Sequence, residues 1–480
     1  MQDGTVLNTT ESLCPECLKR IPARNVRCGD RVYLVKTCPE HGLFRTVVWR
    51  GEPAYESWGL SRRESAKKTF PAEHSGNCPF DCGPCRAHNS RPCAVLLEVT
   101  SRCNLNCPVC FADTRASATG ADPPLQAIEG WYRALLAQGG PCNIQLSGGE
   151  PTVRDDLPEI IALGRKLGFD FIQLNSNGLR LGADRHYAQL LRDAGLGCAF
   201  LQFDGTGDEI YRRIRGEALL RRKEAAIKNC AEHGIGVALV STLVPGVNTA
   251  DIGNLVRYAL RWVPYVRAVH FQPIGYIGRY PKTPRDDDRF TIPEIIRSLE
   301  SQTGGMVRIE NFLPPGGENV HCSFHANFVV LPDGSLKPWV SDSTAYFRDR
   351  AEYDGDGSAR AREFMARQWR APQTREPRNA SRADEPEESS ASLNAFLSRL
   401  ETHTLSISGM AFQDAWNVDL ERLRDCHIGI MSHDNRIIPF CAYNLTSRAG
   451  RTLYRTQDVI HERLQGHAGL RPLDSPKNRL

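Results

Sequence analysis

Short apolar runs alternate with amphipathic segments through the middle of the chain. Six runs have the length and the β-branched or aromatic composition of buried strands, at residues 94–100, 143–147, 171–175, 198–204, 237–243 and 268–273. Segments with helical spacing lie between them, at residues 131–138, 157–167, 187–194, 219–233 and 252–262. Because this alternation builds a parallel sheet with crossover helices, we predict an α/β fold whose core, residues 94–290, is a partial (β/α)6 TIM-like barrel.

Glycine-rich and polar segments stand at the carboxyl ends of the predicted strands. Gly-Gly-Glu follows the second strand, Ser-Asn follows the third and an aspartate ends the fourth; these residues are Gly148, Gly149, Glu150, Ser176, Asn177 and Asp204. Function gathers at this end of parallel barrels, and adjacent glycines let the backbone approach a ligand closely. Alone, most such pairs are turns. Their recurrence on successive strand ends predicts a ligand site.

Three cysteines follow the first predicted strand with C-x3-C-x2-C spacing, at Cys103, Cys107 and Cys110. Three thiolates on one loop hold three corners of a [4Fe-4S] cube and leave the fourth iron open to a small molecule, as in a catalytic cluster. The alternatives are buried thiols or a zinc knuckle. Zinc requires a fourth Cys or His close by, and none follows Cys110 closely. We therefore predict a catalytic cluster here.

The same spacing occurs upstream at Cys78, Cys82 and Cys85, within a segment that spans residues 61–93. We predict that these thiolates bind an auxiliary [4Fe-4S] cluster, whose fourth ligand comes from elsewhere and is not assigned. Context assigns catalysis to the later triplet. That triplet directly follows a strand and leads into the βα repeats, whereas the earlier one lies in a loop-rich segment.

The first 60 residues contain two C-x-x-C/H knuckles on either side of a strand-like run, with ligands at Cys14, Cys17, Cys38 and His41. This spacing predicts a small zinc-ribbon or rubredoxin-like domain that uses a mononuclear metal in place of a core. A Cys3His set suits zinc, but thiolates alone do not choose between zinc and iron. Cys28 is an alternative fourth ligand. We expect a structural or redox role for this site.

The C-terminal region is predicted to be an irregular α+β cluster-ligating region, divided into residues 291–351, a mobile linker or insert at 352–392, and residues 393–480. A β-hairpin is predicted around residue 433, with Cys426 and Cys441 opposite each other at its open end. These two thiols, with Cys322, are candidates for a shared metal or cluster. Free core cysteines and a disulfide are the alternatives, and a reducing compartment disfavours the disulfide.

The bulk properties narrow the class of protein. The chain has 480 residues and a net charge of +4, so charge gives no case for a nucleic-acid partner. It contains no apolar run of 18 residues, which predicts no transmembrane segment, and its start does not resemble a secretory signal. Its 17 cysteines fall in closely spaced sets, which favours metal ligation over disulfides. We expect a cytoplasmic protein; peripheral membrane contact stays open.

The order of these motifs, CPEC…CPEHG, CPFDCGPC, TSRCNLNCPVCF, LSGGEPT and DLERLRDC…IPFCAYNL, resembles the multi-cluster radical S-adenosylmethionine (SAM) enzymes. That group includes the archaeal methanopterin-pathway methylases and the tetraether lipid synthases. The resemblance implies that SAM chelates the open iron and that the Gly-Gly-Glu segment contacts its amino group. It further implies that Ser176 and Asn177 or Asp204 face the SAM carboxylate and ribose. Phe111 would lie near adenine, with a core phenylalanine as the alternative.

The resemblance also implies the chemistry. SAM would be cleaved to a 5′-deoxyadenosyl radical that removes hydrogen from an unactivated carbon, followed by methyl transfer or C–C bond formation on a pterin-like or lipid substrate. Reduction would come from an electron donor such as flavodoxin or ferredoxin. The alternatives are a radical SAM maturase acting on a peptide or protein, and a non-catalytic iron–sulfur electron carrier. The open-site triplet together with Gly-Gly-Glu disfavours the electron carrier.

Overall fold

The computed structural model describes residues 4–59, 77–83, 88–89, 91–113, 121–140, 142–280, 282–339, 357–372 and 397–455. Its described strands form a four-stranded and an eleven-stranded sheet. The described helices are α1 (Tyr55–Gly59), α3 (Leu125–Gly139), α4 (Leu157–Lys166), α5 (Leu179–Ala183), α6 (Arg185–Asp193), α7 (Asp208–Arg215), α8 (Leu220–Glu232), α9 (Ile252–Leu260), α10 (Ile292–Thr303), α12 (Gly357–Gln368), α14 (Leu420–Arg424) and α15 (Phe440–Asn444). None of them is long and apolar enough to cross a membrane.

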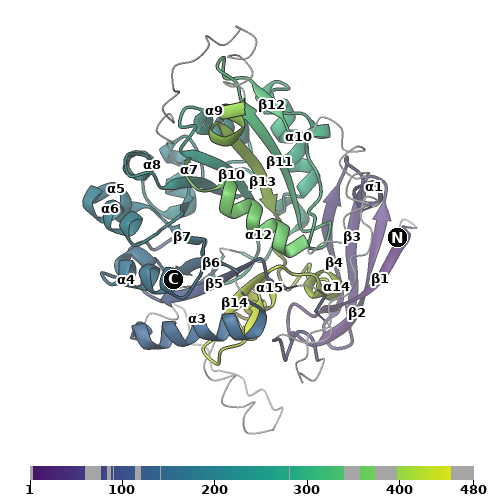
Figure 1. Cartoon of the computed structure of the whole chain (residues 1–480). Helices are drawn as coiled ribbons and strands as arrows, with labels where there is room; N and C mark the ends of the chain where they lie inside the picture. The colour runs from purple at the N-terminus through teal and green to yellow at the C-terminus, as the bar shows by residue number, and fades with distance from the viewer. Residues whose placement is uncertain are drawn as a thin grey trace, which may run out of the picture.

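The middle of the large sheet confirms the predicted alternation of strands and helices. Six parallel strands stand in chain order: β5 (Ala94–Thr100), β6 (Asn143–Gly148), β7 (Ile172–Ser176), β8 (Cys198–Gln202), β9 (Gly236–Leu243) and β10 (Val266–Pro273). The crossover helices cover one face of this sheet (Figure 1). The two edge strands of the sheet do not pair with each other, so the barrel is partial, as predicted.

Strands from the C-terminal region extend the large sheet beyond both edges of its six parallel strands. At one edge lie β13 (Thr404–Met410), β11 (Ser323–Val330) and β12 (Leu336–Pro338), and at the other lie β14 (Ile428–Met431) and β15 (Ile437–Pro439). β14 and β15 form the predicted hairpin, with Ile430 opposite Ile438. Cys426 precedes β14, while Cys441 lies in α15 just after β15. The two cysteines therefore stand near the open end of the hairpin.

Alternate side chains along β5 point to opposite faces of the large sheet and show which face is buried against the helices. Val95, Leu97 and Val99 join the main apolar core with side chains of α3, whereas Leu96 belongs to a second core on the opposite face. Glu98 shares the parity of Leu96, and its side chain is 18% exposed. The face away from the helices, called the inner face below, is therefore where polar residues gather.

Part of the predicted linker is ordered against the inner face. Residues 357–372 include α12, which a linker composition did not predict. The helix packs because Trp369 and its apolar neighbours fill the amino-terminal end of the inner face beside Phe200. Arg267 Nε donates to Gln368 O at 2.7 Å and fixes the end of this helix. The remainder of the predicted linker lies outside the described residues.

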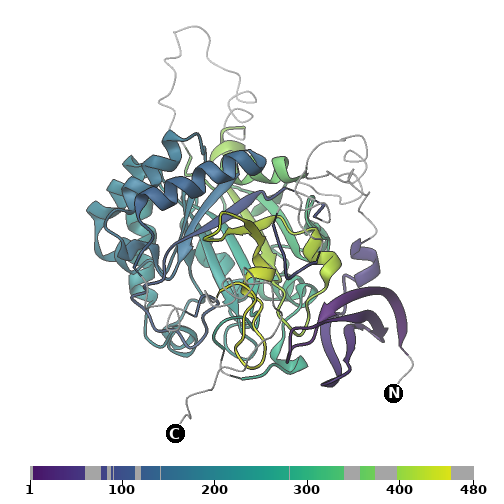
Figure 2. The same cartoon turned by 90° about the horizontal axis from the view of Figure 1, so that it is seen from below.

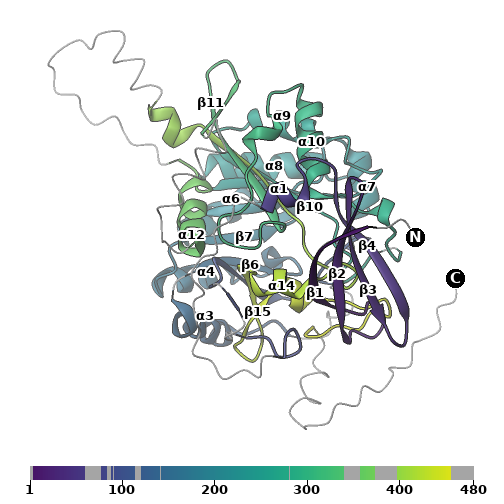
Figure 3. The same cartoon turned by 90° about the vertical axis from the view of Figure 1, so that its right-hand side faces the viewer.

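The four-stranded sheet, called the ribbon below, is an antiparallel meander of β1 (Thr5–Leu13), β2 (Arg20–Cys28), β3 (Arg31–Cys38) and β4 (Gly42–Arg50). It lies beside the large sheet (Figures 2 and 3). Lys36 Nζ, fully buried, donates to Ala415 O at 2.8 Å, and Thr10 Oγ1 donates to Asp419 Oδ1 at 2.6 Å. The ribbon is thus fastened to the segment that precedes Cys426.

Candidate functional site

The loop with Cys103, Cys107 and Cys110 leaves β5 at its carboxyl end and is held by the Gly-Gly-Glu segment. Gly149 N donates to Thr100 O and Glu150 N donates to Arg102 O, both at 2.8 Å. A Cβ on Gly149 would lie 2.1 Å from Arg102 O. The glycine is therefore needed for two backbones to approach each other. This contact fixes the start of the cysteine loop.

A second brace comes from the segment after β10. The Cys110 amide donates to Arg279 O at 3.0 Å, the Arg279 amide donates to Cys110 O at 2.8 Å, and Arg279 Nε donates to Cys107 O at 3.0 Å. Gly278 has φ +62°, and a Cβ there would lie 2.3 Å from Phe111 O. Sequence reasoning missed both residues. The available signal was their place just beyond the sixth strand, at the same end of the sheet.

Arg215 places a positive charge beside the thiols. It forms a two-bonded ion pair with Asp204, at 2.7 and 2.8 Å, and both side chains are buried. Burial raises the pKa of Cys107, while the Arg215 guanidinium opposes that shift. Burial also raises the pKa of Cys103, to about 11. A nearby cation favours the thiolate that an iron ligand requires, so this donor set fits a cluster.

Asp204 itself is engaged by protein groups. Besides Arg215, its Oδ1 accepts from the Thr242 amide at 3.0 Å, and the residue is 0% exposed. Its observed contacts therefore orient Arg215 and join β8 to β9. The direct contact with SAM inferred from the resemblance stays a prediction.

Glu150 joins the ends of β6 and β7. Its carboxylate accepts hydrogen bonds from Thr152 N and Oγ1 at 3.2 and 2.6 Å, from Ser176 Oγ at 2.8 Å and from Asn177 N at 2.6 Å. Asn177 Nδ2 in turn donates to Asn104 Oδ1, inside the cysteine loop, at 2.7 Å. The predicted residues on these two strand ends thus form one hydrogen-bonded network with the loop.

Lys223 is a further residue that sequence reasoning missed. It comes from α8 and is fully buried, and its Nζ donates to Asn177 O and, at 3.3 Å, to Gln202 Oε1. Burial lowers the pKa of this amine to about 8. In the sequence Lys223 is one basic residue on an amphipathic helix, so nothing there distinguishes it from its solvated neighbours.

Phe111 lies at the rim of this site. Its side chain is 36% exposed, which does not fit a core phenylalanine. The ring is 5.8 Å from Phe440, and the Arg455 guanidinium carbon lies 5.9 Å from its centroid. Arg455 also pairs with Glu98 on the inner face at 2.8 Å. The C-terminal region therefore reaches the cysteine loop, and a contact of Phe111 with adenine stays a prediction.

The ribbon brings its four predicted ligands together. The ligand atoms of Cys14, Cys17, Cys38 and His41 all lie within 4.8 Å of one another. Such a Cys3His set fits one tetrahedral ion. Cys28, the alternative ligand, lies outside this group and pairs with Arg31 at the β2–β3 turn.

The other cysteine sets are resolved in part. Cys78 and Cys82 are neighbours whose side chains interact, and Cys85 lies outside the described residues. Cys322, Cys426 and Cys441 are close enough to affect one another electrostatically, and burial raises the pKa of Cys426 to about 12. Arg422 Nη2 lies 3.4 Å from Cys322 Sγ. Unlike the ribbon ligands, these three thiols do not lie within 4.8 Å of one another, so a shared single metal ion is not supported and a cluster stays a prediction.

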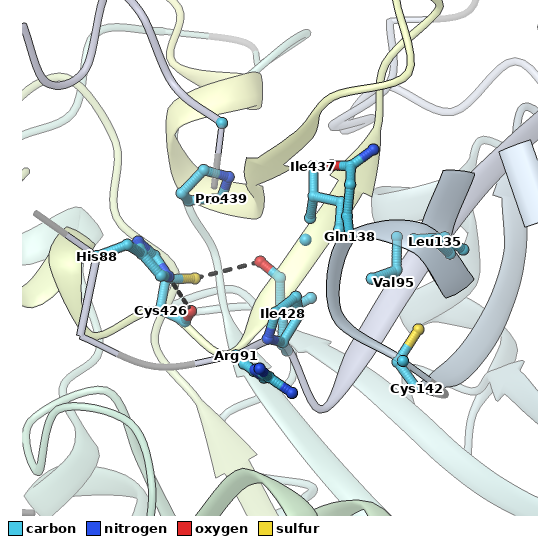
Figure 4. A pocket seen from close by; sticks show the side chains of 14 residues that line it. His88, Arg91, Val95, Leu135, Gln138, Cys142, Cys426, Ile428, Ile437 and Pro439 are labelled. Carbon is cyan, nitrogen blue, oxygen red and sulfur yellow. Dashed lines mark hydrogen bonds between the residues drawn. The ribbon is translucent and has the colours of Figure 1, made fainter. Parts of the chain in front are cut away.

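A pocket adjoins Cys426 and the segment that follows the upstream triplet. His88 and Cys426 form one side of it, and Val95, Leu135 and Cys142 form the other (Figure 4). His88 Nε2 lies 2.8 Å from Cys426 O, so this contact ties the segment after Cys82 to the start of β14. The pocket is therefore bordered by two of the predicted auxiliary cysteine regions.

Comparison with known proteins agrees with this geometry. Residues 6–50 match the HMPTM N-terminal zinc ribbon domain, and residues 97–259 match the radical SAM superfamily. The chain is 34% identical to 7,8-dihydro-6-hydroxymethylpterin dimethyltransferase of Methanocaldococcus jannaschii, over 92% of this chain and 94% of that protein. It is 26% identical to a probable GTP 3',8-cyclase of Methanothermobacter thermautotrophicus, over 59% of this chain and 97% of that one.

Among solved structures, that of Streptococcus suis SuiB bound to precursor peptide SuiA is similar over 45% of this chain and 46% of that one, with 14% identity and a TM-score of 0.38. A likeness at that level adds no argument, whereas the match to the dimethyltransferase spans nearly both chains. The chain is therefore a radical SAM enzyme, which uses SAM and a [4Fe-4S] cluster, and it belongs to the family of that dimethyltransferase.

Proposed function

We propose that this enzyme methylates an unactivated carbon of a pterin-like heterocycle. The observation that carries the proposal is the loop of Cys103, Cys107 and Cys110, braced on both sides and accompanied by a buried arginine. When bound and reduced, a [4Fe-4S] cluster supplies the cleavage of SAM to a 5′-deoxyadenosyl radical, which removes hydrogen from the substrate carbon.

The surrounding residues position the reactants. Gly148 and Gly149 hold the cysteine loop against β6, and the backbone beside them is assigned to the SAM amino group. Ser176 and Asn177 are assigned to the SAM carboxylate and ribose, with Glu150 keeping both strand ends in place. Asp204 acts through Arg215, whose charge favours the thiolate form of Cys107. The exposed ring of Phe111 is assigned to adenine.

The substrate class is supported by two observations. The relative that covers nearly the whole chain is named for a pterin substrate. In addition, the inner face carries Gln145, Gln173 and Asn175 on neighbouring strands. Among the described residues Gln173 Nε2 and Asn175 Oδ1 have no hydrogen-bond partner, and a lipid chain would offer them none. Each unpaired buried polar group costs about 1–3 kcal/mol, so a polar heterocycle is favoured over a lipid.

The remaining metal sites are assigned to electron supply and structure. Auxiliary [4Fe-4S] clusters are proposed at Cys78, Cys82 and Cys85 and in the Cys322, Cys426 and Cys441 group. A mononuclear zinc or iron ion is proposed in the ribbon. Electrons would come from a flavodoxin or ferredoxin, and we place the enzyme in the cytoplasm.

The test is anaerobic reconstitution of the full chain with iron and sulfide, followed by dithionite and SAM. We expect 5′-deoxyadenosine from the wild type, none from Cys107→Ala, and continued formation by Cys82→Ala. Fully iron-loaded wild-type protein that forms no 5′-deoxyadenosine would sink the proposal. The mass of the product then separates the two outcomes of alkylation: addition of single carbons indicates methyl transfer, and the joining of two substrate carbon skeletons indicates coupling.

A further inference from the structure

Three amide side chains form a ladder across β6 and β7 on the inner face. Gln145 Nε2 donates to Gln173 Oε1 at 3.2 Å, and Asn175 Nδ2 donates to Gln145 Oε1 at 3.5 Å. Gln145 and Gln173 face each other in the parallel register, and they are 8% and 0% exposed. These contacts use only part of what three amides can donate and accept.

The amide ladder leaves one donor and one acceptor without a partner among the described residues. Gln173 Nε2 lies beside the Cys198 thiol, a weak acceptor, and has no oxygen or nitrogen acceptor, and Asn175 Oδ1 has no donor. Buried polar atoms are nearly always paired, because an unpaired one loses its bonds to water without replacement. The two atoms belong to residues two positions apart on one strand, so both face the same side of the sheet.

An aromatic wall stands next to the amide ladder. Phe200 on β8 is opposite Asn175 in the parallel register. Trp369, which follows α12, stacks on Phe200 with ring centroids 5.6 Å apart, and His270 on β10 lies 5.5 Å from the same ring. Trp369 Nε1 is a further buried donor without a partner in the described structure. A flat surface and unpaired polar atoms are thus combined in one place.

Resting on the proposed function, we propose that the amide ladder and Phe200 recognise the flat ring of the substrate. Gln173 would donate to a ring carbonyl or ring nitrogen, and Asn175 would accept from a ring N–H or exocyclic amine. Trp369 stacks on Phe200, so Phe200 would meet the substrate ring with its edge rather than with its face. An alkyl chain offers neither a donor nor an acceptor, so this arrangement selects a heterocycle with an amide-like edge.

The test measures binding of 7,8-dihydro-6-hydroxymethylpterin to anaerobically reconstituted full-length protein in the presence of SAM. We compare wild type with Asn175→Leu and Gln173→Met by isothermal titration, with iron content and circular dichroism confirming loaded, folded samples. Asn254→Ala, an exposed amide on α9, is the control. We expect the Kd to rise about tenfold in each ladder variant and to stay unchanged in the control.

A wild-type ligand series covers the case in which a ladder variant does not fold. N3-methylation of the pterin blocks its ring N–H, and we expect about tenfold weaker binding to unaltered protein. Equal Kd values for all variants and for both ligands would overturn the recognition proposal while leaving the proposed function standing. Wild-type protein that cleaves SAM but binds no pterin would instead show that the proposed substrate class is wrong, and the recognition proposal with it.

Discussion

Single buried charges hold the strand ends of this enzyme in place. The Glu150 carboxylate receives four hydrogen bonds, and Arg215 and Lys223 bring two cations into the same region. Such groups are stable inside a protein only when their polar atoms are paired. At the residue scale, the stability of these strand ends therefore depends on a few hydrogen-bond and ion-pair partners, each of which a single substitution removes.

Replacing Glu150 by glutamine tests the first of these charges. In wild type both carboxylate oxygens of Glu150 accept hydrogen bonds. The glutamine amide keeps one acceptor oxygen, but its NH2 group takes the place of the other oxygen and faces a donor. We expect the free energy of unfolding to fall by about 2–3 kcal/mol, because hydrogen bonds to a buried charged group are lost. Denaturant titration measures this. Glu159→Gln, an exposed change on α4, should alter the free energy of unfolding by less than about 0.5 kcal/mol. Equal losses of stability in the Glu150 and Glu159 variants would contradict the argument.

Lys223 should leave a signature in the pH dependence of stability. Its pKa is lowered to about 8 by burial, below its ordinary value of 10.5. Between these two values the unfolded chain binds more protons than the folded one, so this group makes stability rise with pH. Below pH 8 the amine is charged in both states and the slope from it vanishes.

The comparison is between wild type and Lys223→Met, unfolded by denaturant from pH 7 to 10.5. The wild-type curve should be steeper by at most about 1.4 kcal/mol per pH unit, and only in the upper part of this range. Because other groups titrate equally in both proteins, the difference between the curves isolates the lysine. Parallel curves would show that Lys223 is not buried as a weak base.

At the scale of elements, the cysteine loop is shaped by two neighbouring strand ends rather than by its own sequence. The Gly-Gly-Glu segment lies against its start, and the segment with Gly278 and Arg279 lies against its end. Both contacts are between backbones. The loop therefore depends on glycines that stand far from it in the chain.

Gly149→Ala should disrupt the loop. The new Cβ would lie 2.1 Å from Arg102 O, a backbone atom that cannot move without displacing the approach to Cys103. We expect a loss of about 1–3 kcal/mol in the free energy of unfolding, with less iron retained and less 5′-deoxyadenosine formed. Gly130→Ala in α3 is the matched control, because nothing lies within 4 Å of its added methyl. It should be neutral or stabilise by about 0.5–1 kcal/mol. Iron retention equal to the control would contradict this account.

The predictable parts of the fold are those with local signatures. Strand periodicity predicted β5 to β10, and cysteine spacing predicted the ribbon residues whose ligand atoms lie together. The catalytic role of the triplet at Cys103, Cys107 and Cys110 stays a prediction. Arg215 and Lys223 escaped prediction because charged residues on amphipathic helices are usually solvated, and only the packing shows these two buried. The pairing of β13 with β10 was not predicted from the sequence either. Strand partners such as His270 and Ser408 are 138 residues apart, and no local pattern specifies that register.

At the scale of the whole molecule, the ribbon and the catalytic loop are linked through the C-terminal region. Arg448 N donates to Pro15 O at 2.8 Å, between the ligands Cys14 and Cys17, and Arg451 Nη2 donates to Glu16 O at 3.2 Å. A few residues later, Arg455 pairs with Glu98 next to Phe111. The metal knuckle therefore supports a segment that reaches Glu98 and Phe111 beside the cysteine loop.

Loss of the ribbon metal should loosen the C-terminal segment at residues 446–455. We expect Cys17→Ser to lower the thermal midpoint and to increase amide hydrogen exchange in residues 446–455, because their anchors on the knuckle are lost. Cys28→Ser, which lies outside the ligand group, should behave as wild type. Faster exchange confined to the ribbon itself would show that the knuckle and this C-terminal segment are independent.

The buried contacts of the ribbon also bear on the order in which the protein is assembled. Its sheet pairs consecutive strands, so it can form as soon as residues 5–50 leave the ribosome. Its partner Asp419 is 409 residues further along than Thr10 and is synthesised much later. Until then Lys36 has no carbonyl of Ala415 to bind. We therefore expect the ribbon to take up its metal during synthesis, before the cysteines of the C-terminal region are made.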